Sequence, residues 1–377
     1  MNKSLIALAV TSAVAVPVFA QSSVTLYGVI DVGIDYVNNS TDSSGHHGPQ
    51  WSAVSGVTQG SRWGLKGSED LGGGTKAIFQ LENGFNPFTG TLNQHGREFG
   101  RQAYVGLTNA SFGTLTLGRQ YDPIVDLVQP TTMNGNWGAL FSHPSDIDNT
   151  DNGFRINNAV KYVSPSYAGL QAEALYAFGG VAGSFGTNST ISAGLSYKAG
   201  PLYLGAAYFY ARNPAEQFND ANFQSNGSTT HGIFNYVGLP SNMQTFGLGG
   251  TYAIGPALIG VSYSNVRFDN ANGVVGSSTK FDNAELWGQY SLTQAATLAL
   301  GYTYTWGKQD ATGARPKYNQ LNAMADYRLS SRTDVYVQGI FQHATGGANA
   351  DIYDGFAGGQ STTNNQVLAR VGMRHKF

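Results

Sequence analysis

The sequence contains no cysteine, and charged residues make up only 12% of its 377 residues. The absence of cysteine excludes both a disulfide framework and a thiolate metal site. The charged fraction is about half of that in an ordinary soluble domain. The formal net charge is −2 and no basic tail is present, which argues against nucleic acid as a partner.

Long apolar runs are also absent after the first twenty residues. Residues 1–20 combine a basic start at Lys3, an apolar run over residues 5–16 and small residues at the end, which is the pattern of a secretory signal peptide. The run is shorter than the roughly 20 residues that a membrane-spanning helix needs. We therefore expect cleavage after Ala20 and a single domain over residues 21–377 without a transmembrane helix.

The sequence is rich in segments in which apolar and polar residues alternate. Val24, Leu26 and Ile30 share one face of an extended segment, and Tyr27 and Asp31 share the other. Apolar and polar side chains alternate in this way along most of the chain. Glycine is abundant, with 50 residues, and aromatic residues reach 12%. A period of two with this composition predicts an all-β domain.

The connections between the predicted strands alternate between short and long. Seven tight turns and eight longer, polar segments join about sixteen strands. This arrangement is typical of a transmembrane antiparallel β-barrel, which must close on itself because lipid cannot satisfy backbone N–H and C=O groups. A soluble β-sandwich also alternates, but it would have fewer strands and would expose several aromatic faces to water. The turns are residues 69–76, 109–114, 164–170, 198–202, 253–258, 292–297 and 329–333, and the long loops are residues 38–58, 83–96, 122–153, 179–189, 212–243, 268–279, 307–317 and 345–363.

Residues 122–153, after the predicted fifth strand, form the longest stretch without alternation. The stretch carries five aspartates and no lysine or arginine, and Arg119 and Arg155 flank it. Its three prolines and apolar side chains such as Trp137 argue against disorder, because such side chains need something to pack on. A loop of this length in a strand-rich domain is usually functional, and we expect it to fold into the barrel. The aspartates are Asp122, Asp126, Asp146, Asp148 and Asp151.

Catalytic and metal-binding patterns are weak. The sequence has no G-x-S-x-G elbow, no H-E-x-x-H helix and no P-loop, so we expect neither an enzyme nor a cofactor. Residues 146–153, DIDNTDNG, offer Asp146, Asp148 and Asp151 as oxygen ligands for calcium. They lack the spacing and the glutamate of an EF-hand, so a solvated acidic loop is the simpler interpretation.

Basic side chains concentrate on the inward face of the predicted strands. By parity these are Arg62, Lys66, Arg101, Arg155 and Lys161. An arginine facing lipid at mid-depth would cost about 2–4 kcal/mol, which favours the inward placement. Rings of charge inside a pore decide which ions enter it. The alternative role is structural pairing with the acids of residues 122–153, and the two roles are compatible.

Four stretches carry a resemblance to a known family. They are SSVTLYGVIDVGI (22–34), SRWGLKGSEDLGGG (61–74), FGRQAYVGLTNASFGTLTLGRQYDP (99–123) and the closing NNQVLARVGMRHKF (364–377). These stretches resemble the trimeric general porins of Gram-negative bacteria, of the neisserial and burkholderial type. An alternating last strand that ends in Phe377 resembles the signal by which the barrel-assembly machinery recognises outer-membrane proteins.

The resemblance implies a homotrimer in the outer membrane, in contact with lipid and lipopolysaccharide. It further implies that the loop after the fifth strand folds inward and faces a cluster of wall arginines, at positions Arg62, Arg101 and Arg155.

Together the residues and the resemblance predict an outer-membrane porin, a passive channel for ions and small hydrophilic solutes. We expect a modest preference for anions, because arginine stays charged and is weakly hydrated. One alternative is a channel selective for sugars or particular anions; sugars would require aromatic side chains along the lumen, for which only Tyr27, Trp287 and Tyr336 qualify. The other alternative is a surface adhesin. The predicted lining of the narrow part of the pore is Arg62, Lys66, Arg101, Arg155, Lys161, Asp122, Asp126, Asp146 and Asp148.

Overall fold

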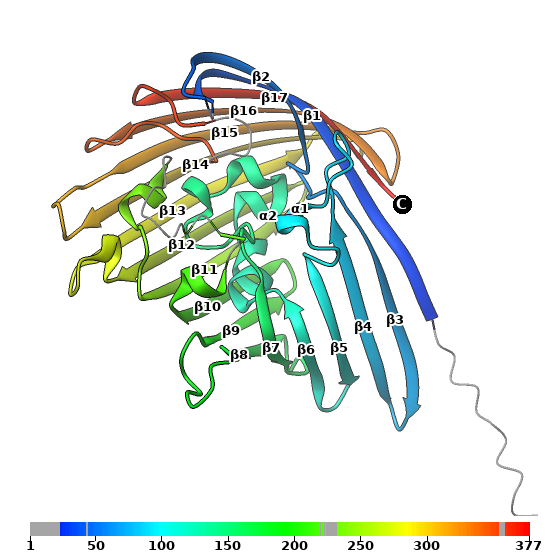
Figure 1. The fold of residues 1–377 in the computed structure, drawn as a ribbon. Coiled ribbons are helices and arrows are strands. Elements are labelled where there is room, and N and C mark those ends of the chain that lie inside the picture. The colour runs from blue at the N-terminus through cyan, green and yellow to red at the C-terminus, as the bar shows by residue number, and fades with distance from the viewer. Residues whose placement is uncertain (1–22, 43, 219, 222, 224–231, 354–358) are drawn as a thin grey trace, which may run out of the picture.

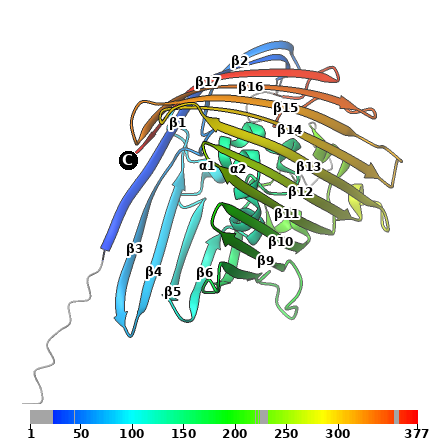
Figure 2. The same ribbon diagram turned by 180° about the vertical axis from the view of Figure 1, so that it is seen from behind.

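The structure, a computed structural model, describes residues 23–42, 44–218, 220–221, 223, 232–353 and 359–377. The predicted signal peptide, residues 1–20, lies outside the described residues. Within the described residues, seventeen strands form one sheet in which every pair of neighbours is antiparallel (Figures 1 and 2). The strands are β1 (Ser23–Thr41), β2 (His47–Ser55), β3 (Arg62–Gly72), β4 (Thr75–Gly84), β5 (Gln102–Asn109), β6 (Gly113–Gln120), β7 (Ile156–Val163), β8 (Leu170–Ala177), β9 (Thr190–Ala199), β10 (Leu202–Arg212), β11 (Asn242–Ile254), β12 (Ala257–Asp269), β13 (Ser278–Ser291), β14 (Ala296–Gln309), β15 (Lys317–Arg328), β16 (Thr333–Thr345) and β17 (Asn365–Lys376).

The sheet closes because the first strand pairs with the last. Val29 to Val37 of β1 lie opposite Lys376 to Leu368 of β17. On its other edge, β1 pairs first with β3 and then with β2. Since β2 and β3 together occupy one position beside β1, the seventeen strands fill sixteen positions. The predicted barrel of about sixteen strands is confirmed.

The outward face of the barrel is apolar and the inward face is polar. On β1, Leu26 and Ile34 are 61% and 58% exposed, whereas Asp31 and Asp35 are completely buried. On β17 the neighbouring Val371 is 62% exposed. This is the arrangement that a barrel in hydrocarbon requires, with apolar side chains towards lipid and polar ones towards the lumen.

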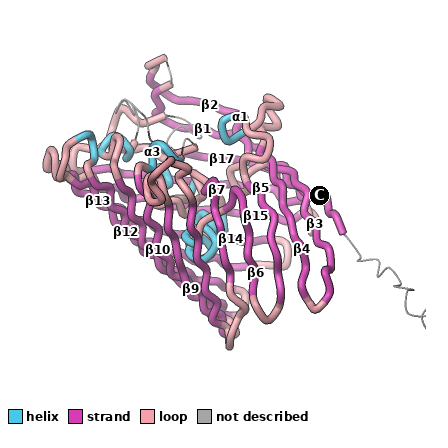
Figure 3. The backbone as a smooth tube through the Cα atoms, turned by 60° about the horizontal axis from the view of Figure 1, so that its bottom comes forward, coloured by secondary structure: helices cyan, strands magenta, loops and turns pink. Residues whose placement is uncertain are grey.

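Short turns gather at one end of the barrel and longer loops at the other (Figure 3). The turn between β3 and β4 falls within the predicted residues 69–76. The predicted loop over residues 38–58 is wrong in one respect, because most of it forms the end of β1 and all of β2. Here the alternation continues, and Tyr36 on β1 packs against Trp51 on β2 with ring centres 4.9 Å apart.

Short helices lie between the strands, and several of them are inside the barrel (Figure 1). In the described part of the chain, none of these helices has the length and hydropathy to cross a membrane. The helices are α1 (Asn93–Gly96), η1 (Ile124–Val128), η2 (Gln129–Thr131), α2 (Met133–Trp137), η3 (Ala139–Phe141), η4 (Pro144–Asp146), α3 (Pro214–Gln217), η5 (Ile233–Tyr236) and η6 (Ala271–Gly273).

Candidate functional site: the narrow part of the lumen

The segment between β6 and β7, residues 121–155, crosses the interior of the barrel. It contains η1, η2, α2, η3 and η4, and most of its side chains are buried. Helix η1 contacts β9, β10 and β11, and η2 contacts β10, β11 and β12. The segment therefore covers one side of the barrel wall, which leaves the lumen open on the side of the N-terminal strands.

Glycines in the wall allow this close approach. A Cβ atom at Gly205 on β10 would overlap the carbonyl oxygen of Leu127, and one at Gly249 on β11 would overlap the hydroxyl of Thr131. Tyr203 adds a hydrogen bond from its hydroxyl to the Leu127 carbonyl, at 2.9 Å. The wall thus offers a groove without side chains into which η1 and η2 fit.

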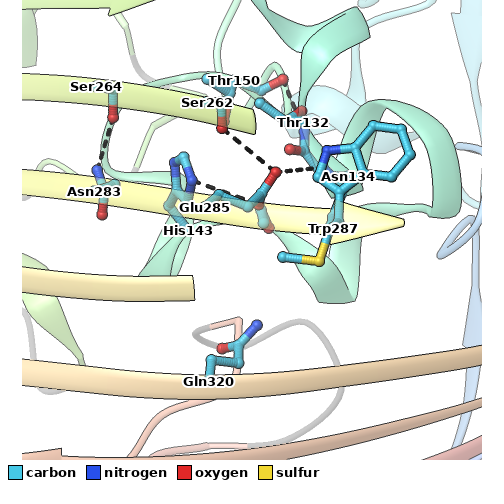
Figure 4. Close-up of polar contacts among 12 residues, drawn as sticks. Thr132, Asn134, His143, Thr150, Ser262, Ser264, Asn283, Glu285, Trp287 and Gln320 are labelled. Carbon is cyan, nitrogen blue, oxygen red and sulfur yellow. Dashed lines mark hydrogen bonds and ion pairs between the residues drawn. The ribbon is translucent and has the colours of Figure 1, made fainter. Parts of the chain in front are cut away.

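A buried histidine attaches the segment to the wall (Figure 4). His143 Nδ1 lies 2.6 Å from Asp148 Oδ2, and its Nε2 lies 3.6 Å from Glu285 Oε2 on β13. Glu285 also accepts a hydrogen bond from the backbone N–H of Met133 at 2.7 Å, and the Ser264 hydroxyl donates to Asp148. Burial lowers the pKa of His143, but the two carboxylates outweigh burial and hold that pKa above its ordinary value. The two acids on either side of the ring therefore favour the charged form of the imidazole.

Two of the predicted acids hold the segment's own backbone. Asp122 accepts from the N–H of Ile124 and from the side chain of Asn149, both at 2.8 Å. Its burial raises the pKa of Asp122 to about 7. Asp146 accepts from the N–H groups of Asp151 and Gly153 at 2.7 and 2.6 Å. These carboxylates therefore stabilise the fold of the loop through hydrogen bonds within it.

Another predicted acid and a predicted base pair with each other. Asp126 forms an ion pair with Lys161 on β7, and Lys161 lies 3.4 Å from Glu173 on β8. The Lys161 ammonium also donates to the carbonyl of Tyr121 at 3.1 Å. This group ties the start of the segment to the wall.

A cavity of about 600 Å³ remains between the segment and the N-terminal strands. Arg62, Arg101 and Arg155 all line it. Arg101 Nε donates to Glu82 Oε1 at 2.8 Å, and Arg62 Nε lies 3.6 Å from the other oxygen of Glu82. Arg155 forms no ion pair among the described residues, and its Nε has no hydrogen-bond partner there. Burial and the charge of Arg101 lower the pKa of Arg155 to about 10, so Arg155 remains charged at neutral pH.

Asp151 is the loop acid that reaches this cavity. It accepts a hydrogen bond from the Tyr353 hydroxyl at 2.7 Å and one from the side chain of Asn134 at 3.4 Å. Its burial raises the pKa of Asp151 above the ordinary value. The cavity wall therefore combines arginines with a carboxylate that gains a proton more readily than usual.

The structure thus brings together three of the nine predicted lining residues. Asp122, Asp126, Asp146, Asp148 and Lys161 do not line this cavity, and Lys66 lines an adjoining one. Four further charged residues line the cavity that the predicted lining did not include, namely Glu82, Asp151, Arg374 and Lys376. The parity of β4 and β17 already placed Glu82, Arg374 and Lys376 inside the barrel, so the signal was available for these three.

Comparisons with known proteins identify the family. A sequence model of the family described as Gram-negative porin matches residues 6–347. An outer membrane porin protein of Bordetella pertussis is 30% identical over 90% of this chain and 94% of its own length. Outer membrane porin protein 32 of Delftia acidovorans is 30% identical over the full length of both chains.

Solved structures share the fold. The anion-selective porin from Comamonas acidovorans superposes with a TM-score of 0.75 at 24% identity, covering 95% of this chain and 100% of that one. The trimer form of OmpT from Vibrio cholerae reaches a TM-score of 0.68 at 18% identity, over 94% and 99% of the two chains. With the family match and the closed barrel together, the chain belongs to the Gram-negative porins, and it is a passive channel of the outer membrane, not an enzyme.

Proposed function

We propose that this porin prefers small anions over cations and that Arg62, Arg101 and Arg155 set the preference. The observation that carries the proposal is the charge of the 600 Å³ cavity. Five cationic side chains line it, against two carboxylates, Glu82 and Asp151. An excess of fixed positive charge in a narrow opening attracts anions and repels cations. The lining cations are Arg62, Arg101, Arg155, Arg374 and Lys376.

The loop acids oppose this preference less than their number suggests. Asp126 is paired with Lys161, and Asp148 is paired with His143. Asp122 and Asp146 are buried, and burial raises the pKa of both. Arginine keeps its charge at neutral pH, and this holds for Arg155 even with its pKa lowered to about 10, so the positive charge of the arginines persists there.

The aromatic candidates support a general pore over a sugar-selective one. Trp287 is 2% exposed and donates to the carbonyl of Thr131 at 2.8 Å. Tyr336 is 2% exposed and donates to Asp31. Tyr27 donates to Glu82 at 2.8 Å. Two of the three rings are therefore unavailable to stack on a sugar in the lumen.

The assembly is part of the same proposal. We infer a homotrimer from the sequence resemblance, and the trimer form known for a structural neighbour supports it. We also infer that the outward-facing side chains of β17, together with Phe377, engage the barrel-assembly machinery. The apolar outer face of the barrel would contact outer-membrane lipid and lipopolysaccharide. Small hydrophilic solutes and ions are the proposed cargo.

The zero-current potential in a salt gradient across a planar bilayer tests the anion preference. Wild type should show the sign expected for anions. The double variant Arg101→Glu, Arg155→Glu changes the fixed charge of the cavity wall by four, so its potential should move towards cation preference.

A matched control makes the same change in charge outside the cavity. Arg267 and Lys308 are 44% and 57% exposed and pair with Asp269 and Asp310. The variant Arg267→Glu, Lys308→Glu should leave the potential close to that of wild type. An unchanged potential in the Arg101, Arg155 variant would show that these arginines do not lie at the narrow point.

A further inference from the structure

A second, smaller cavity adjoins the first one. Its volume is about 270 Å³, and it shares Gln59, Arg62, Glu82 and Lys376 with the first cavity. Lys66 on β3 is its additional charged wall residue. The two cavities therefore form one path along the N-terminal strands, with Arg62 at the junction.

This cavity lies towards the end of the barrel that carries the short turns. Lys66 precedes by a few residues the turn between β3 and β4, which runs from Gly72 to Thr75. Lys376 ends β17, whose other end follows a long loop after Thr345. An ion that passes the arginine cluster towards the short turns thus meets Lys66 and Lys376.

The charges in this cavity are unbalanced. The side chains of Arg62, Lys66 and Lys376 supply three positive charges and that of Glu82 one negative charge, so the lining side chains sum to +2. Glu82 is already engaged by Tyr27, Arg101 and Arg62.

The two lysines are available to a ligand. Among the described residues, neither Lys66 nor Lys376 forms an ion pair, and both are exposed residues that line the cavity. The Lys66 ammonium lies 5.2 Å from the centre of the Tyr27 ring. The nearby terminal residue, Phe377, accepts a hydrogen bond from the N–H of Gly28 at 3.0 Å, and its side chain is outside the cavity wall.

We propose that Lys66, Lys376 and Arg62 form a binding site for a small divalent oxyanion, of the sulfate or hydrogen phosphate type, beyond the arginine cluster. The inference rests on the proposed anion preference and adds a second anion-binding position along the pore. Lysine and arginine are the usual ligands of such anions, and a dianion matches the net charge of +2. The volume admits the ion with part of its water, so binding is weak enough for the ion to leave, as conduction requires.

The test uses the refolded full chain in planar bilayers, with chloride as the current carrier and sulfate as the probe. Sulfate should reduce the chloride current of wild type, more strongly when it is added on the side of the short turns. The variant Lys66→Gln, Lys376→Gln removes two charges next to the bound ion and should weaken the block at least about tenfold. Monovalent nitrate at the same concentration should not block wild type.

The control pair removes two lysines at the same end of the barrel. Lys76 and Lys198 lie beside short turns and line neither cavity, so Lys76→Gln, Lys198→Gln should keep the sulfate block. Equal block in both double variants, or an equal loss in both, would overturn the site. If the double variant does not refold, the single variant Lys66→Gln should show part of the loss, and wild-type block in it would also overturn the site.

Failure of this site can be told apart from failure of the proposed anion preference. The zero-current potential of wild type in a chloride gradient reports on the arginine cluster. Sulfate block reports on Lys66 and Lys376. A wild-type channel that prefers anions but is not blocked by sulfate would remove this inference and leave the proposed function intact.

Discussion

Among single residues, His143 connects the inner segment, residues 121–155, to the barrel wall. It is 1% exposed and stands between Asp148 and Glu285. Removing one partner of a buried ion pair is strongly destabilising because it leaves a charge without compensation. The histidine is also the member of the group that titrates nearest to neutral pH in the free state.

The raised pKa of His143 predicts how barrel stability depends on pH. The contribution of a histidine with a raised pKa is fully present below its unfolded value of about 6.5 and is lost as the pH rises through the folded value. We therefore expect the unfolding temperature in detergent to fall on the alkaline side. His143→Gln should cost about 3–5 kcal/mol at pH 6 and should flatten this alkaline fall, as measured by circular dichroism.

His343→Gln is the control for that measurement. His343 is near the barrel surface and bonds to Asn365, with no carboxylate in an ion pair with it among the described residues. This variant should keep the alkaline fall of wild type. A His143→Gln protein with the same pH profile as wild type would mean that the ion pair does not hold the segment.

Among the secondary-structure elements, the inner segment packs closely against β10 and β11 because glycines of these strands have no side chain at the points of contact. Gly205→Val would push a side chain into the Leu127 carbonyl, and overpacking of this kind costs about 1–3 kcal/mol. We expect a lower unfolding temperature and a noisier single-channel current, because η1 can no longer rest on the wall.

The matched control is Gly339→Val on β16. Gly339 is also a strand glycine, but an added Cβ there meets no atom within 4 Å. Unfolding temperature and current noise should stay near the wild-type values. Comparable effects at both positions would indicate a general cost of valine in the strands, without any role of the contact to η1.

At the scale of the whole molecule, the two ends of the barrel differ in their connections, and this difference predicts the orientation in the membrane. Long loops of outer-membrane barrels face outward, and short turns face the periplasm. Because the chain has no cysteine, a single cysteine gives an unambiguous label. On intact cells a membrane-impermeant thiol reagent should label Ser44→Cys, in the loop between β1 and β2, and should not label Ser111→Cys, in the turn between β5 and β6. Both variants should react after the cells are lysed, and the reverse pattern on intact cells would contradict this orientation.

The barrel could be predicted from the amino-acid sequence alone. The alternation of Val24, Leu26 and Ile30 with Tyr27 and Asp31 is repeated strand after strand, and a period of two fixes which face each side chain takes once one face must meet lipid. The same rule placed Arg62 and Lys66 inside the lumen, and it placed Glu82, Arg374 and Lys376 there as well.

Which of these charges face the open lumen depends on how the inner segment packs against the wall. Residues 122–153 have no period, so their pattern could not tell Asp151, which reaches the cavity, from Asp148, which is buried against His143. The division of the second strand position into β2 and β3 also depended on contacts with β1 that are distant in sequence. In a strand, the period of the sequence shows which face a side chain takes. In a loop, the position of a side chain depends on packing against distant parts of the chain, about which the loop's own sequence carries no information.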